Sequence, residues 1–118
     1  MSTLAGEGDS KSELEELLEL CPEALESEEA GVTFYLLPQL EMPIGRSPAR
    51  VDALLCPSAR DGYSSRLFLA EQVSAGTKTL NWNRQIRVLE RNWFAVSWRT
   101  PSGLRLAQMV AIHLEAFR

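Results

Sequence analysis

Short runs of strand-forming residues, each followed by turn-forming residues, fill the middle of this chain. The first run, at residues 31–37, is rich in β-branched and aromatic side chains, which favour strands. Similar runs cover residues 51–56 and 66–71, and a fourth falls somewhere within residues 79–90. Proline and glycine between the runs exclude a long helix from the connections. Because consecutive strands with short connections pair antiparallel, the pattern predicts an antiparallel four-stranded meander.

Segments with helical periodicity lie on either side of the predicted strands. Residues 11–20 are predicted to form a helix, with Ser12 as a candidate N-cap and glutamates in the first turn, where the helix dipole favours negative charge. The residues after 101–103 repeat apolar side chains over three turns and form the clearest helix of the chain. Helices before and after a sheet can cover one face, so we expect an α+β fold with the C-terminal helix packed on the sheet. The apolar stripes are Leu14, Leu17, Leu18 and Cys21 in the first helix and Leu106, Met109, Val110, His113, Leu114 and Phe117 in the second.

Two stretches between these elements have no clear period. Residues 23–30 are polar and acidic and are predicted to form a loop or one more helical turn. Residues 91–98 suit a strand and a helix almost equally, and we expect an irregular or short extended segment there. At the start of the chain, residues 1–10 are rich in glycine, serine and threonine and are predicted to be a disordered leader. Residues 11–118 then form a single domain.

The charge of the chain is unevenly distributed. Residues 1–30 have a net charge of −9 and residues 31–118 a net charge of +5, which together give −4. The second part falls short of the basic footprint of a nucleic-acid-binding protein, so nucleic acid is not an expected partner. An acidic protein partner is one interpretation of this excess; the other is that the leader simply neutralises the body. No apolar run approaches the ~20 residues that span a membrane, and the acidic start lacks a secretory signal, so we expect a cytoplasmic protein with no membrane partner.

The residue types that most often carry chemistry are few. Cys21 and Cys56 lack metal-ligand spacing, and His113 is the single histidine, so neither a metal site nor a cofactor is expected. Cys21 and His113 lie on apolar stripes, where a core or edge position is the more frequent role. Cys56 ends a predicted strand, and no histidine or lysine lies near it in sequence to lower the pKa of its thiol. Asp52 lies inside the same strand and is expected either on a solvated face or paired with an arginine.

The segment at residues 84–101 concentrates the residue types found at binding sites. It carries two of the three tryptophans and four arginines, with one serine between bulky neighbours. Exposed tryptophan and arginine are enriched at the hot spots of protein interfaces. We therefore expect chemistry or recognition at this segment, in a cleft formed by Arg91, Trp93, Ser97, Trp98 and Arg99.

Five short motifs follow one another along residues 31–118. They are Phe34-Tyr35-Leu36-Leu37, Pro43-Ile44-Gly45, Asp52-Ala53-Leu54-Leu55-Cys56-Pro57, Gly62-Tyr63 and Trp93-Phe94-Ala95-Val96-Ser97-Trp98-Arg99. In this order and spacing they resemble the prokaryotic family E branch of the ubiquitin-conjugating (UBC) superfamily. The resemblance implies a UBC-like fold and a role in a bacterial ubiquitin-like conjugation pathway. A ubiquitin-like protein and its activating enzyme are the implied partners.

The chain departs from the usual pattern of that superfamily at the catalytic position. A conjugating enzyme of the usual kind carries the C-terminus of the ubiquitin-like protein as a thioester on a cysteine after the fourth strand, with a His-Pro-Asn stretch upstream. No cysteine follows Cys56 in this chain, and no His-Pro-Asn is present. The resemblance therefore implies a conjugating-enzyme relative without the usual catalytic cysteine.

Ser97 lies in roughly the region of the missing cysteine and is the candidate catalytic residue. In one interpretation it carries an oxyester, Arg91 and Arg99 hold the acyl oxygen or the acidic tail of the carrier protein, and Trp93 and Trp98 shape the cleft. A serine is weak without an adjacent base, and arginines stay protonated. The alternative is a catalytically inactive UBC-like module that docks the ubiquitin-like protein or the activating enzyme. A third interpretation is a small structural protein whose motifs match by chance.

Overall fold

The computed structural model describes residues 12–60, 62–74 and 80–118, and the predicted leader lies outside this part of the chain. Within these residues the fold consists of two α-helices, six strands and a short 3₁₀ turn. All of the strands belong to one antiparallel sheet, so the expected α+β class is confirmed. The elements are α2 (Glu13–Leu20), β1 (Leu25–Glu29), β2 (Val32–Glu41), β3 (Arg50–Cys56), β4 (Arg66–Leu69), β5 (Trp82–Val88), β6 (Arg91–Val96), α3 (Leu106–Leu114) and the 3₁₀ turn η1 (Glu115–Phe117).

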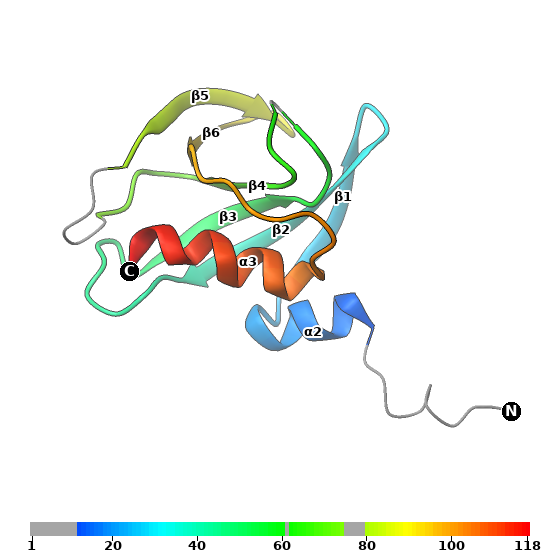
Figure 1. Cartoon of the computed structure of the whole chain (residues 1–118), viewed down its shortest axis with the longest axis horizontal. Helices are drawn as coiled ribbons and strands as arrows, with labels where there is room; N and C mark the ends of the chain where they lie inside the picture. The colour runs from blue at the N-terminus through cyan, green and yellow to red at the C-terminus, as the bar shows by residue number, and fades with distance from the viewer. Residues whose placement is uncertain (1–11, 61, 75–79) are drawn as a thin grey trace, which may run out of the picture.

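The sheet has the strand order β1-β2-β3-β4-β6-β5, so six strands replace the four that were predicted. The first four strands form a consecutive meander, and the β5–β6 hairpin extends it, with β6 next to β4 and β5 at the edge. Figure 1 shows the sheet bending, with β5 and β6 curled over one side and α2 and α3 on the other. The C-terminal helix packs on the sheet, as expected.

The two additional strands arise from tight hairpins. The acidic stretch expected as a loop or helical turn contains β1, which reaches β2 through a two-residue turn at Ala30 and Gly31. β6 corresponds to the short extended segment, one of the two alternatives expected for residues 91–98, and follows β5 through Leu89 and Glu90. All four turn residues have positive φ, the conformation that matches the twist of a two-residue hairpin. β1 has little strand propensity of its own, because three of its five residues are glutamates, so its pairing with β2 makes it a strand.

Each face of the sheet carries a buried core cluster, which packs against a different part of the molecule. Side chains alternate as predicted: Leu37 of β2 faces the helices, whereas Phe34 faces away from them. On the helix side, Leu17 of α2 and Val110 of α3 pack on the sheet. On the opposite side, strands β2, β3 and β4 meet β5 and β6 in a second cluster, which the bend of the sheet makes possible. Its buried members are Phe34, Leu54, Cys56, Phe68, Val88, Trp93 and Ala95.

The N-terminus of α2 is capped as predicted, and its acidic side chains also cap α3. Ser12 Oγ accepts a hydrogen bond from the Glu15 backbone N–H at 3.1 Å, and Glu15 Oε1 accepts one from the Ser12 N–H at 2.9 Å. Glu13 Oε1 accepts the backbone N–H of Leu106 at 3.1 Å, which satisfies a donor in the first turn of α3. An arginine–glutamate ion pair of 2.7 Å joins the same two segments. The first and the final helix are therefore held together by polar contacts as well as by the core.

Candidate functional site

The cleft predicted at residues 91–99 is closed, because its central tryptophan is buried. The Trp93 side chain is 0% exposed and belongs to the second core cluster. Its Nε1–H donates to the Val88 carbonyl at 2.9 Å, across the β5–β6 hairpin. A buried ring whose single donor is satisfied has nothing to offer a partner. The expectation that Trp93 lines a binding site is therefore wrong; large aromatic side chains dominate cores as well as interfaces.

Arg91 begins β6 and takes part in a structural network. Its Nη2 lies 3.5 Å from Asp52 Oδ2, and its guanidinium lies over the Trp93 ring, 4.6 Å from the ring centre. The Asp52 carboxylate also accepts hydrogen bonds from the backbone N–H and the side-chain amide of Gln39, both at 3.0 Å. These bonds, with a smaller effect of the Arg91 charge, hold the pKa of Asp52 below its ordinary value. Gln39 has a φ of 53° and lies at the irregularity in the β2–β3 pairing, so Asp52 stabilises this bulge and pairs with an arginine, one of its two expected roles.

Arg99 lies at the other end of the same segment. Its Nη1 donates to the Gly62 carbonyl at 3.2 Å, and its guanidinium lies 5.1 Å from the centre of the Tyr63 ring. Arg91 and Arg99 are eight residue steps apart, most of them in β6, which corresponds to roughly 25 Å at ~3.3 Å per residue. The two arginines cannot act on the same atom, so the structure divides the predicted site into two separate places.

Ser97 follows β6, and no base lies beside it in the part of the chain that the structure describes. Its hydroxyl donates to Asn83 Oδ1 at 3.3 Å, and Arg66 Nη2 donates to the same oxygen at 2.8 Å. A serine becomes a nucleophile when an adjacent base takes its proton, and an amide oxygen held by an arginine does not do so. The neighbouring Trp98 is half-buried and donates through Nε1 to the Ile112 carbonyl at 3.0 Å, which fixes this segment to α3. The arrangement positions Ser97 but does not activate it.

The single histidine belongs to a buried polar cluster that sequence reasoning missed. Ser65 Oγ lies 2.9 Å from His113 Nε2 and 3.0 Å from Thr100 Oγ1, and all three side chains are less than one-tenth exposed. Burial, reinforced by the nearby charge of Arg66, lowers the pKa of His113 to about 4, so the imidazole is neutral at pH 7. The cluster joins the turn before β4, the segment after β6 and α3. Its members are 35 and 48 residues apart in sequence, so no local pattern could have revealed it.

Both cysteines are buried as well. Cys21 is 3% exposed, its Sγ donates to the Pro38 carbonyl at 3.4 Å, and burial raises the pKa of its thiol. Cys56 is 0% exposed and ends β3 within the second core cluster. Thiolate chemistry needs access to the reactant, which neither residue has. In the described part of the chain, no group of three or more His, Cys, Asp or Glu side chains could hold a metal ion.

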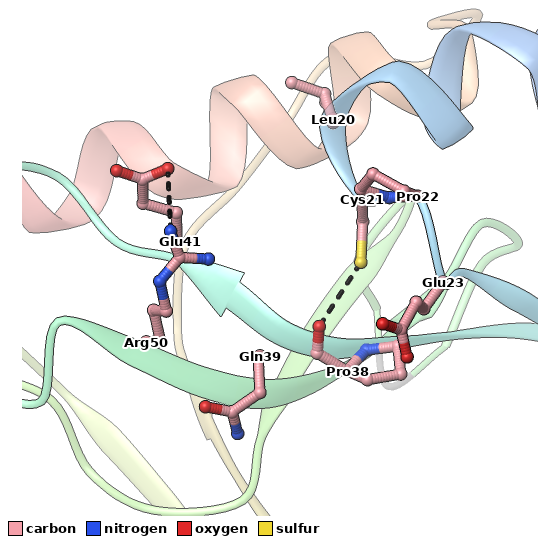
Figure 2. A pocket seen from close by; sticks show the side chains of 8 residues that line it. All are labelled: Leu20, Cys21, Pro22, Glu23, Pro38, Gln39, Glu41 and Arg50. Atoms are coloured by element: carbon pink, nitrogen blue, oxygen red, sulfur yellow. Dashed lines mark hydrogen bonds and ion pairs between the residues drawn. The ribbon is translucent and has the colours of Figure 1, made fainter.

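Three hollows in the molecular surface meet at Leu20, the C-terminal residue of α2. The first, of about 410 Å³, lies between α2 and α3. The second, of about 190 Å³, lies between the end of α2 and strands β2 and β3; Figure 2 shows Leu20 and Cys21 across it from Pro38, Glu41 and Arg50. The third, of about 240 Å³, lies between α3 and the connection after β2. Leu20 lines all three hollows and is 48% exposed.

The name Leu20 surface is used below for the apolar residues that line these hollows. Leu20 lies outside the predicted stripe, of which Leu17, Leu18 and Cys21 pack on the core and Leu14 is 39% exposed. This position is the signal by which the sequence could have revealed Leu20. Charged residues of both signs line the same hollows and form a polar rim. The apolar members that reach the surface are Leu20, Pro22, Pro38, Pro43, Ala107, Ala111 and Leu114, and the other apolar lining residues are buried.

Comparison with known proteins does not place the chain in a family. No protein-family model, no curated protein and no solved structure matches it significantly. None of the helices in the described ranges is long and apolar enough to cross a membrane. The fold and the surfaces described above are therefore the basis for assigning a function.

Proposed function

We propose that the chain is a UBC-like docking protein of a bacterial ubiquitin-like conjugation pathway. In this role it binds the ubiquitin-like protein or its activating enzyme without forming a covalent bond to either. The observation that carries the proposal is the Leu20 surface, where a leucine is left half exposed at the junction of three hollows. An exposed apolar patch with a polar rim is typical of a protein-binding site.

The order of elements supports the UBC-like part of this proposal. A helix precedes four consecutive antiparallel strands, and α3 packs together with α2 on one side of the sheet. Parallel strands, or a final helix away from the sheet, would have favoured a chance match of the motifs. The β5–β6 hairpin has no place in a helix–meander–helix plan, but it adds to the meander at one edge and leaves the four strands in order.

The described residues contain no activated nucleophile, which favours docking over transfer. Because β1 is a strand, the fourth strand is β4, and residues 70–81 follow it instead of the region around Ser97. No cysteine occurs at residues 70–81. Ser74 Oγ, in this stretch, accepts the backbone N–H of Ser47 at 2.9 Å and supports the β2–β3 connection. Ser97 itself donates to an amide oxygen and has no base to take its proton.

The first test is a binding measurement with the ubiquitin-like protein and the activating enzyme of the organism that encodes the chain. We expect a stoichiometric complex with one of them, and we expect Leu20→Arg to weaken it by about tenfold or more, which corresponds to ~1.4 kcal/mol of lost contact energy. Arginine suits the C-terminal end of a helix, so this variant should stay folded.

Leu25→Arg is the matched control for this binding measurement. Leu25 is 61% exposed, and it is opposite Leu36, whose side chain packs on the other side of the sheet from the helices. We expect Leu25→Arg to bind as the wild type does. A complete lack of binding by the wild type, or equal binding by wild type and Leu20→Arg, would contradict the proposal.

The second test separates docking from transfer. With the activating enzyme, the ubiquitin-like protein and ATP present, we expect no covalent adduct on the chain after denaturing electrophoresis. A base-labile adduct that disappears in Ser97→Ala would replace the docking interpretation by oxyester transfer.

A further inference from the structure

The sheet has two outer edges, and they carry opposite charges. β1 and β5 are the outermost strands, and each pairs with only one neighbour among the residues that the structure describes. The sequence of β1 is Leu-Glu-Ser-Glu-Glu, with three acids and no base, whereas β5 contains two arginines and no acid. An edge strand presents a row of backbone donors and acceptors that can take up a further strand. Like edges of two copies repel each other, and unlike edges attract.

On each face of the sheet, the side chains of β1 are also complementary to those of β5. Glu26 is opposite Tyr35, which packs on the helix side, so the exposed Glu26 and Glu28 lie on that side of β1. On β5, Ile86 packs into the second core cluster, and the exposed Arg87 next to it therefore lies on the helix side too. Leu25, 61% exposed, and the half-buried Ile86 lie on the other side. A β1–β5 pair would set glutamate against arginine on one face and leucine beside isoleucine on the other.

The strand directions are also compatible with such a pair. Neighbouring strands are antiparallel throughout the sheet, so β1 and β5, at its two ends, run in opposite directions. A second copy in the same orientation presents its β1 antiparallel to the β5 of the first copy. Figure 1 shows the sheet curled between β1 and β5, its two outermost strands. The curl brings one end of each strand together within the molecule, where Glu29 Oε2 at the end of β1 accepts the backbone N–H of Leu89, just after β5, at 3.0 Å. Glu26, Glu28 and Arg87 take no part in this contact.

We propose that β1 of one copy of this chain pairs with β5 of a second copy, so that two sheets join edge to edge. The contact is head-to-tail, and repeats of it either close into a ring or extend into a filament. A five-residue strand buries less surface than the about 1,200 Å² of stable complexes, so the association is weak. Because exposed charges contribute to it, salt weakens it further.

Sedimentation equilibrium of the full chain tests this proposal. We expect the average mass to rise above the 13.2 kDa of the monomer as the concentration approaches about 1 mM in low salt. It should return to the monomer mass in about 1 M salt, where the Debye length is ~3 Å. The double variant Glu26→Arg, Glu28→Arg sets arginine against arginine, and Arg87→Glu sets glutamate against glutamate. Each should be monomeric alone, and an equimolar mixture of the two should associate again, because opposite charges then meet.

Two control variants show whether the edges are responsible. Glu71→Arg reverses an exposed charge away from both strands, and Leu20→Arg changes the Leu20 surface; both should associate as the wild type does. Self-association and partner docking can therefore fail independently. Thermal unfolding of each variant checks that it is folded. A wild type that stays monomeric at about 1 mM in low salt, or a mixture that does not associate, would overturn the proposal.

Discussion

The β6 segment and the end of α2 differ in what their residue types suggest and in what their side chains do. Residues 91–99 contain the tryptophans and arginines that typify interfaces, yet Trp93 is fully buried and Arg91 is paired within the molecule. α2 is an ordinary amphipathic helix, yet its final leucine is half exposed among three hollows. Aromatic rings offer a large apolar area and guanidinium groups offer several hydrogen-bond donors. A curled sheet can use both for contacts within the molecule, as Trp93 and Arg91 do here. The exposure of Leu20 in the fold therefore indicates an available surface better than the residue types of residues 91–99 do.

The largest expected effect contrasts these two regions directly. Trp93→Ala removes a fully buried ring and its hydrogen bond to Val88 and should lower the free energy of unfolding by about 3–5 kcal/mol. Leu20→Ala, at an exposed position, should change it by no more than about 0.5 kcal/mol. Urea denaturation of both variants measures the difference. Similar losses in the two variants would mean that the tryptophan is less enclosed than the structure has it.

A second expected effect concerns the buried polar cluster beside the β6 segment. His113 has an ordinary pKa of 6.5 when unfolded and about 4 when folded, so between these values the unfolded chain binds a proton that the folded chain does not. The contribution of His113 to the free energy of unfolding is fully present above pH 6.5. About 3 kcal/mol of this contribution is lost as the pH falls to about 4. Denaturation curves across this range should show the loss, and His113→Asn should flatten it. An unchanged slope in the variant would assign the pH dependence to other groups.

A smaller effect is expected for the ion pair at the start of β6. The Arg91 and Asp52 side chains are 43% and 34% exposed, so water weakens their attraction. A double-mutant cycle with Arg91→Ala and Asp52→Asn should give a coupling below about 1 kcal/mol. Asp52→Asn alone should cost about 1–2 kcal/mol at neutral pH, because the carboxylate also accepts two hydrogen bonds from Gln39. A coupling well above that of exposed pairs would show that this end of β6 is more enclosed than described.

The smallest expected effect is a gain in stability at the turn between β5 and β6. Glu90 is exposed and has a φ of 61°, a conformation that glycine adopts without strain. Glu90→Gly should therefore raise the free energy of unfolding by about 0.5–1 kcal/mol, despite the added flexibility of the unfolded chain. Thermal unfolding measures this gain. Gly31→Ala, at the φ of 79° in the β1–β2 turn, is the reverse experiment and should destabilise the chain.

Features with a local signal were predictable from the sequence, and features made by distant contacts were not. The Ser12 cap, the two helices and the alternation of Phe34 and Leu37 each follow from residues close together in the chain. The hairpin turn at Leu89 and Glu90 has none of the usual turn residues, so the sequence did not reveal that the segment after it pairs with β5 as strand β6. The candidate site was wrongly placed at residues 91–99, because the burial of Trp93 depends on the bend of the whole sheet and leaves no local pattern in the sequence. Among the residues of the Leu20 surface, Leu20 is the one with a local signal in the sequence, which is its position outside the apolar stripe of the first helix.

The hydrogen bond between Glu13 and Leu106 has a consequence for the order in which the chain assembles. The helix that contains Glu13 leaves the ribosome early, whereas the amide that its carboxylate accepts is synthesised 93 residues later. Contacts between segments so far apart in sequence form late and slow down folding. α2 can pack on the sheet through Leu17 before this bond exists, so we expect the contact between the two helices to form after the contacts of α2 with the sheet.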